Sequence, residues 1–166
     1  MNYFNLEKLG RTRLSENFFM REFLYSEVAN YYGISNIPSD IDFAIENGQI
    51  LCSTILEPLQ QQFGRLFIRS GYRSEMLNNF CNRKRLNCAS NKRNYARHIW
   101  DVRDVNGHAG AMACIVIPAY IECFNRTGSV EDLKHWINNN IEHSEIRFFK
   151  NLAAFNIGWK EVCIKK

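Results

Sequence analysis

Four side chains of types that bind divalent metals lie close together in the sequence: His98, Asp101, Asp104 and His108. Imidazole and carboxylate groups are the usual protein ligands of zinc, and three of them with a bound water form a hydrolytic centre. His98, Asp101 and Asp104 are the candidate metal-binding and catalytic set if a backbone bulge turns His98 toward Asp101. Without a bulge, strand alternation places His98 on the opposite face as a hydrogen-bonded core histidine, and no metal or other cofactor is expected.

The same region carries the net positive charge of the chain. Residues 69–103 contain nine basic and two acidic residues, which leaves twelve basic and fifteen acidic residues elsewhere. Arg73, Arg97 and Arg103 would suit a small anion, because a guanidinium donates two parallel hydrogen bonds to a carboxylate or phosphate. The alternative is nucleic-acid binding through residues 83–97. The overall charge of +4 is modest for binding a duplex and no DNA-binding motif accompanies it, so the small anion is preferred.

Two strands are expected to position these side chains: an apolar strand over residues 66–68 and an alternating strand over residues 98–103. The first leads into a glycine turn, and the second follows a polar surface loop. Alternation along the second strand places Asp101 either in a pocket or in an ion pair with Arg73 or Arg103. Both arrangements place the carboxylate beside an arginine.

The rest of the chain shows helical and strand periodicities in turn. A long helix is expected to begin with Ser39 as its N-cap and to continue to Phe63. Further helices are expected over residues 20–32, 75–81, 118–124 and 130–141, and further strands over residues 111–117, 145–148 and 155–159. This order predicts an α+β domain in which a small antiparallel sheet packs with helices.

Length and composition indicate a single domain over residues 1–166, because 46% of the residues are apolar and 13% are aromatic. No run approaches the roughly 20 apolar residues of a membrane helix, and the first residues lack a signal-peptide pattern. We therefore expect a cytoplasmic protein with no membrane partner. The six cysteines are expected to be free thiols, since a chain of this size needs no disulfides for stability.

Several motifs between residues 14 and 104 resemble the zinc-dependent D-alanyl-D-alanine carboxypeptidases, which share a fold with the Hedgehog amino-terminal domain. The matching motifs are Leu14-Ser15-Glu16-Asn17-Phe18, Asn36-Ile37-Pro38, Leu56-Glu57-Pro58-Leu59 with Phe63-Gly64, and Ser70-Gly71-Tyr72-Arg73-Ser74 with Asn78. The resemblance implies a Hedgehog/DD-peptidase-like fold, and it is closest to phage- and prophage-encoded members.

The resemblance also implies where a zinc site would lie. The family binds zinc through a histidine, an aspartate seven residues later and a histidine on a late strand, with a glutamate as general base. Asp101 matches the aspartate, whereas Asn94, Asn156 and Ala153 stand at the two histidines and the glutamate. An amide oxygen is a weak zinc ligand, so the resemblance implies a degenerate metal site. Arg73 matches the arginine that holds the substrate carboxylate.

These patterns together predict a degenerate peptidase-fold protein that binds, rather than hydrolyses, an anionic small molecule or a protein segment. A phage protein that sequesters or blocks a host factor would act in this way. The ligand-binding residues are expected to be Tyr72, Arg73, Asn94, Arg97, Asp101, Arg103 and Asn156. The alternative is a zinc-dependent hydrolase of cell-wall peptide built on His98, Asp101 and Asp104.

Overall fold

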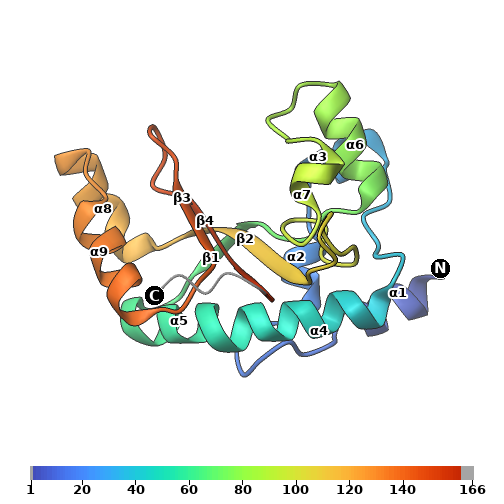
Figure 1. The fold of residues 1–166 in the computed structure, drawn as a ribbon, viewed down its shortest axis with the longest axis horizontal. Helices are drawn as coiled ribbons and strands as arrows, with labels where there is room; N and C mark the ends of the chain where they lie inside the picture. Colours follow the sequence, from blue (N-terminus) through green and yellow to red (C-terminus); the bar gives the residue numbers. More distant parts are fainter. Residues whose placement is uncertain (1, 162–166) are drawn as a thin grey trace.

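The computed structural model describes residues 2–161, which form helices around a small antiparallel sheet (Figure 1). The expected mixture of helices with such a sheet is confirmed. The helices are α1 (Tyr3–Gly10), α2 (Met20–Leu24), α3 (Glu27–Tyr32), α4 (Ile41–Leu51), α5 (Glu57–Phe63), α6 (Glu75–Arg83), α7 (Asn91–Asn94), α8 (Pro118–Thr127) and α9 (Glu131–Asn140). The strands are β1 (Phe67–Ser70), β2 (Gly110–Val116), β3 (Glu145–Phe148) and β4 (Phe155–Lys160).

The sheet has the strand order β1-β2-β4-β3, and every neighbouring pair is antiparallel. Successive side chains of a strand point to opposite faces, so the buried Ala113, Ile115 and Ile157 share one face, which packs on α4. We call the opposite face the outer face. One row of paired residues crosses the outer face through all four strands: Ser70, Cys114, Asn156 and Arg147.

The predicted long helix consists of α4, a π-helical turn (Cys52–Leu56) and α5, and it runs beneath the sheet (Figure 1). Pro58 supplies a cause for the π-helical turn. Proline has no N–H to donate, and its ring excludes the carbonyl oxygen four residues earlier, that of Thr54 within the turn. The widened turn therefore lets the helix continue past a residue that would otherwise break it.

The helix begins one residue later than predicted. The Oδ1 of Asp40 accepts a hydrogen bond from the Phe43 N–H at 3.0 Å, so Asp40 is the N-cap and Ser39 is not. The Ser39 N–H instead donates to Oδ2 of Asp101 at 2.8 Å. The Asp40 carboxylate thus accepts the hydrogen bond from the first turn of the helix that the Ser39 hydroxyl was expected to accept.

Asp40→Ala should reduce the free energy of unfolding by about 1 kcal/mol, because it removes the side-chain acceptor of the first turn of α4. Urea denaturation at neutral pH measures this change. Ser39→Ala is the matched control and should leave stability nearly unchanged, since only the backbone N–H of Ser39 is engaged. A larger loss for Ser39→Ala than for Asp40→Ala would place the cap at the predicted residue instead.

The predicted helix over residues 20–32 is two helices. Helix α2 ends at Leu24, and α3 begins after Ser26, whose Oγ accepts from the Ala29 N–H at 3.3 Å. The serine side chain competes with the backbone for hydrogen bonds and so starts a new helix. Helix α1 was not predicted, and the polar run expected as a surface loop contains α7 and the buried Asn94.

The predicted strand over residues 98–103 is wrong, because this segment forms consecutive turns. Ala96 adopts a left-handed backbone conformation with φ of 54°. Its N–H faces two carbonyl oxygens, those of Ile99 at 3.1 Å and Val102 at 3.0 Å, so the chain coils around this one residue. His98, Ile99 and Trp100 are consecutive and all buried, which this coil allows and the predicted strand alternation does not.

Within residues 2–161, no helix is both long enough and apolar enough to cross a lipid bilayer. The five cysteines in this part of the chain are free thiols, as predicted. Cys163 lies outside the described residues.

Candidate functional site

The glycine turn after β1 and the coiled segment after α7 are held directly against each other. The Arg73 N–H donates to the carbonyl oxygen of His98 at 2.7 Å, and Nδ1 of His98 lies 2.8 Å from the carbonyl oxygen of Gly71. Gly71 leaves no room for a side chain, since an added Cβ would lie 2.7 Å from Cβ of Phe23. The two segments that carry most of the predicted site residues therefore meet.

His98 is a buried neutral histidine, which is the expected core role. A carbonyl oxygen only accepts, so Nδ1 carries the proton toward Gly71 and Nε2 is the acceptor nitrogen of the neutral ring. Burial, and then the positive charge of Arg73, lower the pKa of His98 to about 3. The amide of Asn156 lies near the imidazole and opposes this decrease. At neutral pH the ring adds no positive charge to its surroundings.

Arg73 points to the outer face of the sheet, where it meets only neutral groups. Its guanidinium donates to Oγ of Ser70 at 3.2 Å, to Sγ of Cys88 at 3.2 Å and, at 3.5 Å, to Oδ1 of Asn78. Arg73 is half-buried, and no carboxylate among residues 2–161 lies within ion-pair distance of it. We call Arg73, its three contacts and the neighbouring His98 and Asn156 the Arg73 cluster.

Asn94 belongs to an amide network beside this cluster. Its Nδ2 donates to Oδ1 of Asn78 at 2.7 Å, and Nδ2 of Asn78 donates in turn to Oδ1 of Asn91 at 2.8 Å. Asn78 and Asn94 are both buried. Asn94, which the resemblance placed at the first metal ligand, is thus a structural hydrogen-bond donor that joins α6 to α7.

Asp101 lies away from the Arg73 cluster. Its Oδ1 accepts from the Tyr72 hydroxyl at 3.0 Å, and its Oδ2 accepts from the Ser39 N–H. Of the two alternatives for Asp101, the ion pair with Arg73 or Arg103 is wrong among the described residues. Asp101 instead lines a surface pocket, in which Arg103 is also a lining residue. Tyr72 itself is buried, and burial together with the Asp101 charge raises its pKa far above the usual range. The hydrogen bond between these two residues joins the glycine turn to the coiled segment.

Asn156 is the cluster residue with unused hydrogen-bonding capacity. It lies on β4 opposite Cys114 of β2 and Arg147 of β3. Its side-chain oxygen is buried and has no hydrogen-bond partner of acceptable geometry among residues 2–161. The same side chain lies beside the imidazole of His98, so a half-rotation of the amide would present its NH2 group to Nε2 of the neutral ring.

Asp104 and Arg103 belong to a different network, near the end of β4. Oδ2 of Asp104 accepts from Nζ of Lys160 at 2.9 Å, and Oδ1 accepts from the backbone N–H groups of Asn106 and His108. The Lys160 hydrogen bond is the main cause that holds the pKa of Asp104 far below its usual range. Arg103 pairs with Glu161 at 2.8 Å. These hydrogen bonds and the ion pair stabilise a surface loop.

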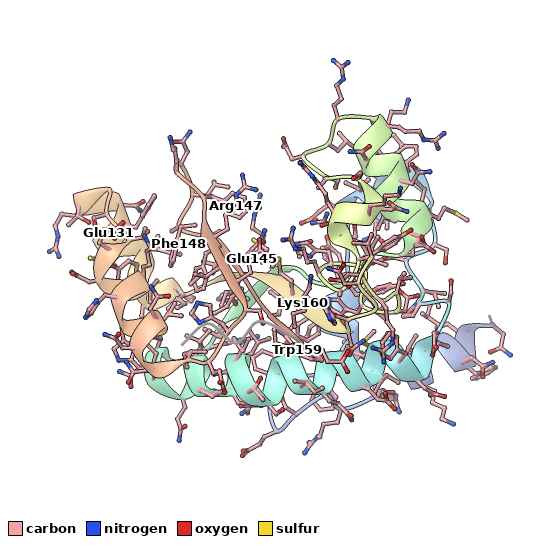
Figure 2. All side chains as sticks on the ribbon, viewed as in Figure 1. Glu131, Glu145, Arg147, Phe148, Trp159 and Lys160 are labelled. Carbon is pink, nitrogen blue, oxygen red and sulfur yellow. The ribbon has the colours of Figure 1, made fainter. Side chains whose placement is uncertain are left out.

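Arg97 connects the coiled segment to the other side of the outer face. Its Nη2 lies 2.6 Å from Oε2 of Glu145 on β3. Figure 2 shows Glu145 and Arg147 on the side of β3 that faces α6 and α7, whereas Phe148 points toward α8 and α9. The Arg97–Glu145 pair spans the outer face, and Arg147 lies exposed beside it.

The described residues do not fit a zinc site. Among residues 2–161, no three histidine, cysteine, aspartate or glutamate side chains come close enough to hold a metal ion. His98 is buried at Gly71, Asp101 binds Tyr72, and Asp104 binds Lys160, so the three candidate ligands face three different partners. Nδ1 of His108 lies 3.6 Å from Oδ1 of Asp104.

The basic residues suggested for nucleic-acid binding lie on one exposed part of the molecule. Arg83 ends α6, Lys84 and Arg85 follow it, and Lys92 and Arg93 lie on α7. All five are exposed. Nucleic-acid binding by this surface stays a prediction.

No known protein family, no curated protein and no solved structure matches the chain. The fold and the site together define a mixed helix-and-sheet protein with a cationic cluster on the outer face of its sheet. Of the predicted ligand-binding residues, Arg73 and Asn156 belong to the cluster and Asn94 lies beside it. His98 was expected as a core histidine. Ser70, Asn78 and Cys88 were not predicted as site residues. Short neutral side chains carry no sequence signal of their own, and they are assigned to the site only by their contacts with Arg73.

Proposed function

We propose that this chain is a degenerate protein of the Hedgehog/DD-peptidase-like fold that binds an anionic group at the Arg73 cluster and does not hydrolyse a peptide there. The observation that carries the proposal is the half-buried guanidinium of Arg73, whose contacts are all neutral. A partly desolvated cation without a counter-charge is unfavourable, and a bound carboxylate or phosphate would remove that penalty.

The charges around the cluster support the same ligand chemistry. Arg69 and Arg73 both act on the thiol of Cys114, where their positive charges oppose the rise in its pKa that burial causes. Arg73 and Arg97 both act on His98. Because Glu145 neutralises only Arg97, the outer face keeps an excess of positive charge that attracts anions.

Asn156 offers a second contact for the ligand. A half-rotation of the amide exchanges its oxygen and its NH2 group. Asn156 can therefore either accept a hydrogen bond from the ligand or donate one to it. A carboxylate bound by Arg73 would thus find a further donor in Asn156. The neighbouring His98 is neutral at pH 7, so Arg73 provides the positive charge nearest to the bound group.

The ligand is an anionic small molecule or a protein segment that presents a carboxylate. In a phage-encoded protein, such binding would sequester a host metabolite or block a host factor. The resemblance to DD-peptidases suggests the D-alanyl-D-alanine dipeptide as one probe, because its terminal carboxylate matches the group that the arginine holds in that family. Inorganic phosphate serves as the second probe.

Calorimetric titration of the purified protein should detect binding of D-alanyl-D-alanine or of phosphate. We expect Arg73→Ala to weaken that binding by about 10- to 100-fold, which corresponds to one charge-assisted hydrogen-bonding group. Arg126→Ala is the matched control, because Arg126 is an exposed arginine on α8. Equal affinities in the wild type and Arg73→Ala, or no binding of either probe, would contradict the proposal.

The hydrolase alternative is tested in the same preparation. The dipeptide is incubated with the protein and added zinc, and released D-alanine is measured. We expect no release above that of the Asp101→Ala variant. Zinc-dependent release that Asp101→Ala abolishes would show that the chain is an enzyme.

A further inference from the structure

The loop after α6 brings two cysteines together beside Arg73. Arg85 and Asn87 both adopt left-handed backbone conformations, with φ of 56° and 59°, and so reverse the chain direction. The reversal is held by the Leu86 N–H, which donates to the Cys81 carbonyl oxygen at 2.9 Å, and by Nδ2 of Asn82, which donates to the Cys88 carbonyl oxygen at 2.8 Å. Residue 88 is thereby folded back onto residue 81.

The two thiols differ in their surroundings. Cys81 is 2% exposed and packs with Leu77 and Ala29, and the half-buried Cys88 packs against this small apolar cluster. Burial, and then the adjacent sulfur of Cys88, raise the pKa of Cys81 to about 12. Cys81 therefore remains a protonated thiol at neutral pH, in direct reach of its partner sulfur.

The positive charge of Arg73 lies beside the sulfur of Cys88. Nη1 of Arg73 donates to Sγ of Cys88 at 3.2 Å. A partly accessible sulfur beside an arginine, with a second cysteine next to it, is the arrangement in which a cysteine is oxidised and then resolved by its neighbour. A structural core cysteine such as Cys52, which is fully buried, has no such partner cation in its described contacts.

We propose that Cys88 and Cys81 form a reversible intramolecular disulfide, with Cys88 as the attacking sulfur and Cys81 as the resolving thiol. The oxidant is a hydroperoxide. Sγ of Cys88 attacks the O–O bond, which gives a sulfenic acid on Cys88 and, with hydrogen peroxide, one water. The Cys81 sulfur then attacks the sulfenic sulfur, its proton leaves with the hydroxyl as a second water, and the S–S bond forms.

The electrons and atoms balance in this sequence: two thiols lose two hydrogens, and one peroxide becomes two waters. A small dithiol reverses it by exchange and is itself oxidised. The proposal does not rest on anion binding, because the disulfide is defined by the two sulfurs and the Arg73 contact alone.

The experiment uses the full chain with Cys123→Ser and Cys163→Ser, so that the half-buried Cys123 and the cysteine outside the described residues cannot react. The reduced protein is treated with hydrogen peroxide, quenched by alkylation and analysed by intact mass and peptide mapping. We expect a mass lower by two hydrogens, a single cross-linked peptide pair that contains Cys81 and Cys88, and full recovery of both thiols with dithiothreitol.

Two variants separate the roles of the residues. Arg73→Gln should slow disulfide formation on the order of tenfold, because the positive charge beside the attacking sulfur is lost. Arg83→Gln removes the same charge from an exposed site at the end of α6 and should react at the wild-type rate. Thermal unfolding of each reduced variant establishes that the protein is folded before its rate is compared.

Three results would overturn the proposal. One is a treated protein that keeps both hydrogens or gains only oxygen on Cys88. Another is a cross-link that excludes Cys81. The third is a folded Arg73→Gln variant that reacts as fast as Arg83→Gln, which would remove the role of the arginine contact.

Discussion

Lowering the pH from 7 to 5 should reduce the free energy of unfolding by about 2 kcal/mol through His98 alone. The folded-state pKa of His98 is about 3, below the ordinary value of 6.5, so the unfolded chain binds the proton more tightly. The contribution of His98 is therefore fully present above pH 6.5. It is lost as the pH falls from 6.5 toward 3, by about 1.4 kcal/mol for each pH unit.

Urea denaturation at several pH values between 7 and 5 measures this loss. His98→Asn is the informative variant, because its side-chain NH2 can still donate toward the Gly71 carbonyl oxygen but does not titrate. We expect its stability to change much less over this range than that of the wild type. His135→Asn, on an exposed part of α9, should follow the wild-type pH profile.

Identical pH profiles for the wild type and His98→Asn would show that His98 is not held neutral by its surroundings. Asp104 does not interfere with the comparison. Its lowered pKa means that its stabilising contribution is present above the ordinary carboxyl value of 3.8 and is lost only below it, outside the measured range.

Trp100→Ala should reduce the free energy of unfolding by about 3–5 kcal/mol, the largest effect we expect for a single substitution in this chain. The Trp100 side chain is fully buried, with its ring 5.2 Å from that of Phe23 and 6.0 Å from that of Tyr72. Its Nε1–H also donates to the Met112 carbonyl oxygen at 3.1 Å. The substitution would leave both a large cavity and an unpaired buried carbonyl.

Chemical denaturation of Trp100→Ala and Trp136→Ala provides the comparison. Trp136 packs against Phe63 at 4.8 Å but is only half-buried, so its removal should cost less than half as much. Equal losses for the two variants would mean that the coil around Trp100 relaxes into the vacated space. In that case the segment that positions His98 would be far less rigid than its hydrogen bonds indicate.

Apolar periodicity was sufficient to predict β2, β3 and β4 and the long helix, because each of these elements buries one regular face. It failed over residues 98–103, where a strand was predicted but the three consecutive residues His98, Ile99 and Trp100 are all buried. The difference is the left-handed conformation of Ala96, which no side-chain property of alanine signals. Only the tertiary hydrogen bonds to Ile99 and Val102 stabilise that conformation.

The sequence predicts the part of the candidate site that is positioned by local turns and by strand pairing. Arg73 and His98 are joined by backbone hydrogen bonds, and Asn156 reaches them through the register of β2 and β4. Asp101 lies apart from these residues because its carboxylate accepts a hydrogen bond from the Ser39 N–H, which is 62 residues away in the sequence. That N–H is available only because α4 is capped by Asp40 and not by Ser39. No spacing in the sequence expresses such a contact.

The π-helical turn settles a geometric conflict in the long helix. Leu51, Ile55, Leu59 and Phe63 recur at every fourth residue, and each four-residue step of an α-helix over-rotates by about 40°. Three steps would carry Phe63 about 120° around the helix axis from Leu51. The widened turn takes up roughly one residue of rotation, about 100°, so the four side chains can face the same core. Deleting one residue between Cys52 and Leu56 would therefore let the segment continue as a regular α-helix with Leu59 and Phe63 still facing the core.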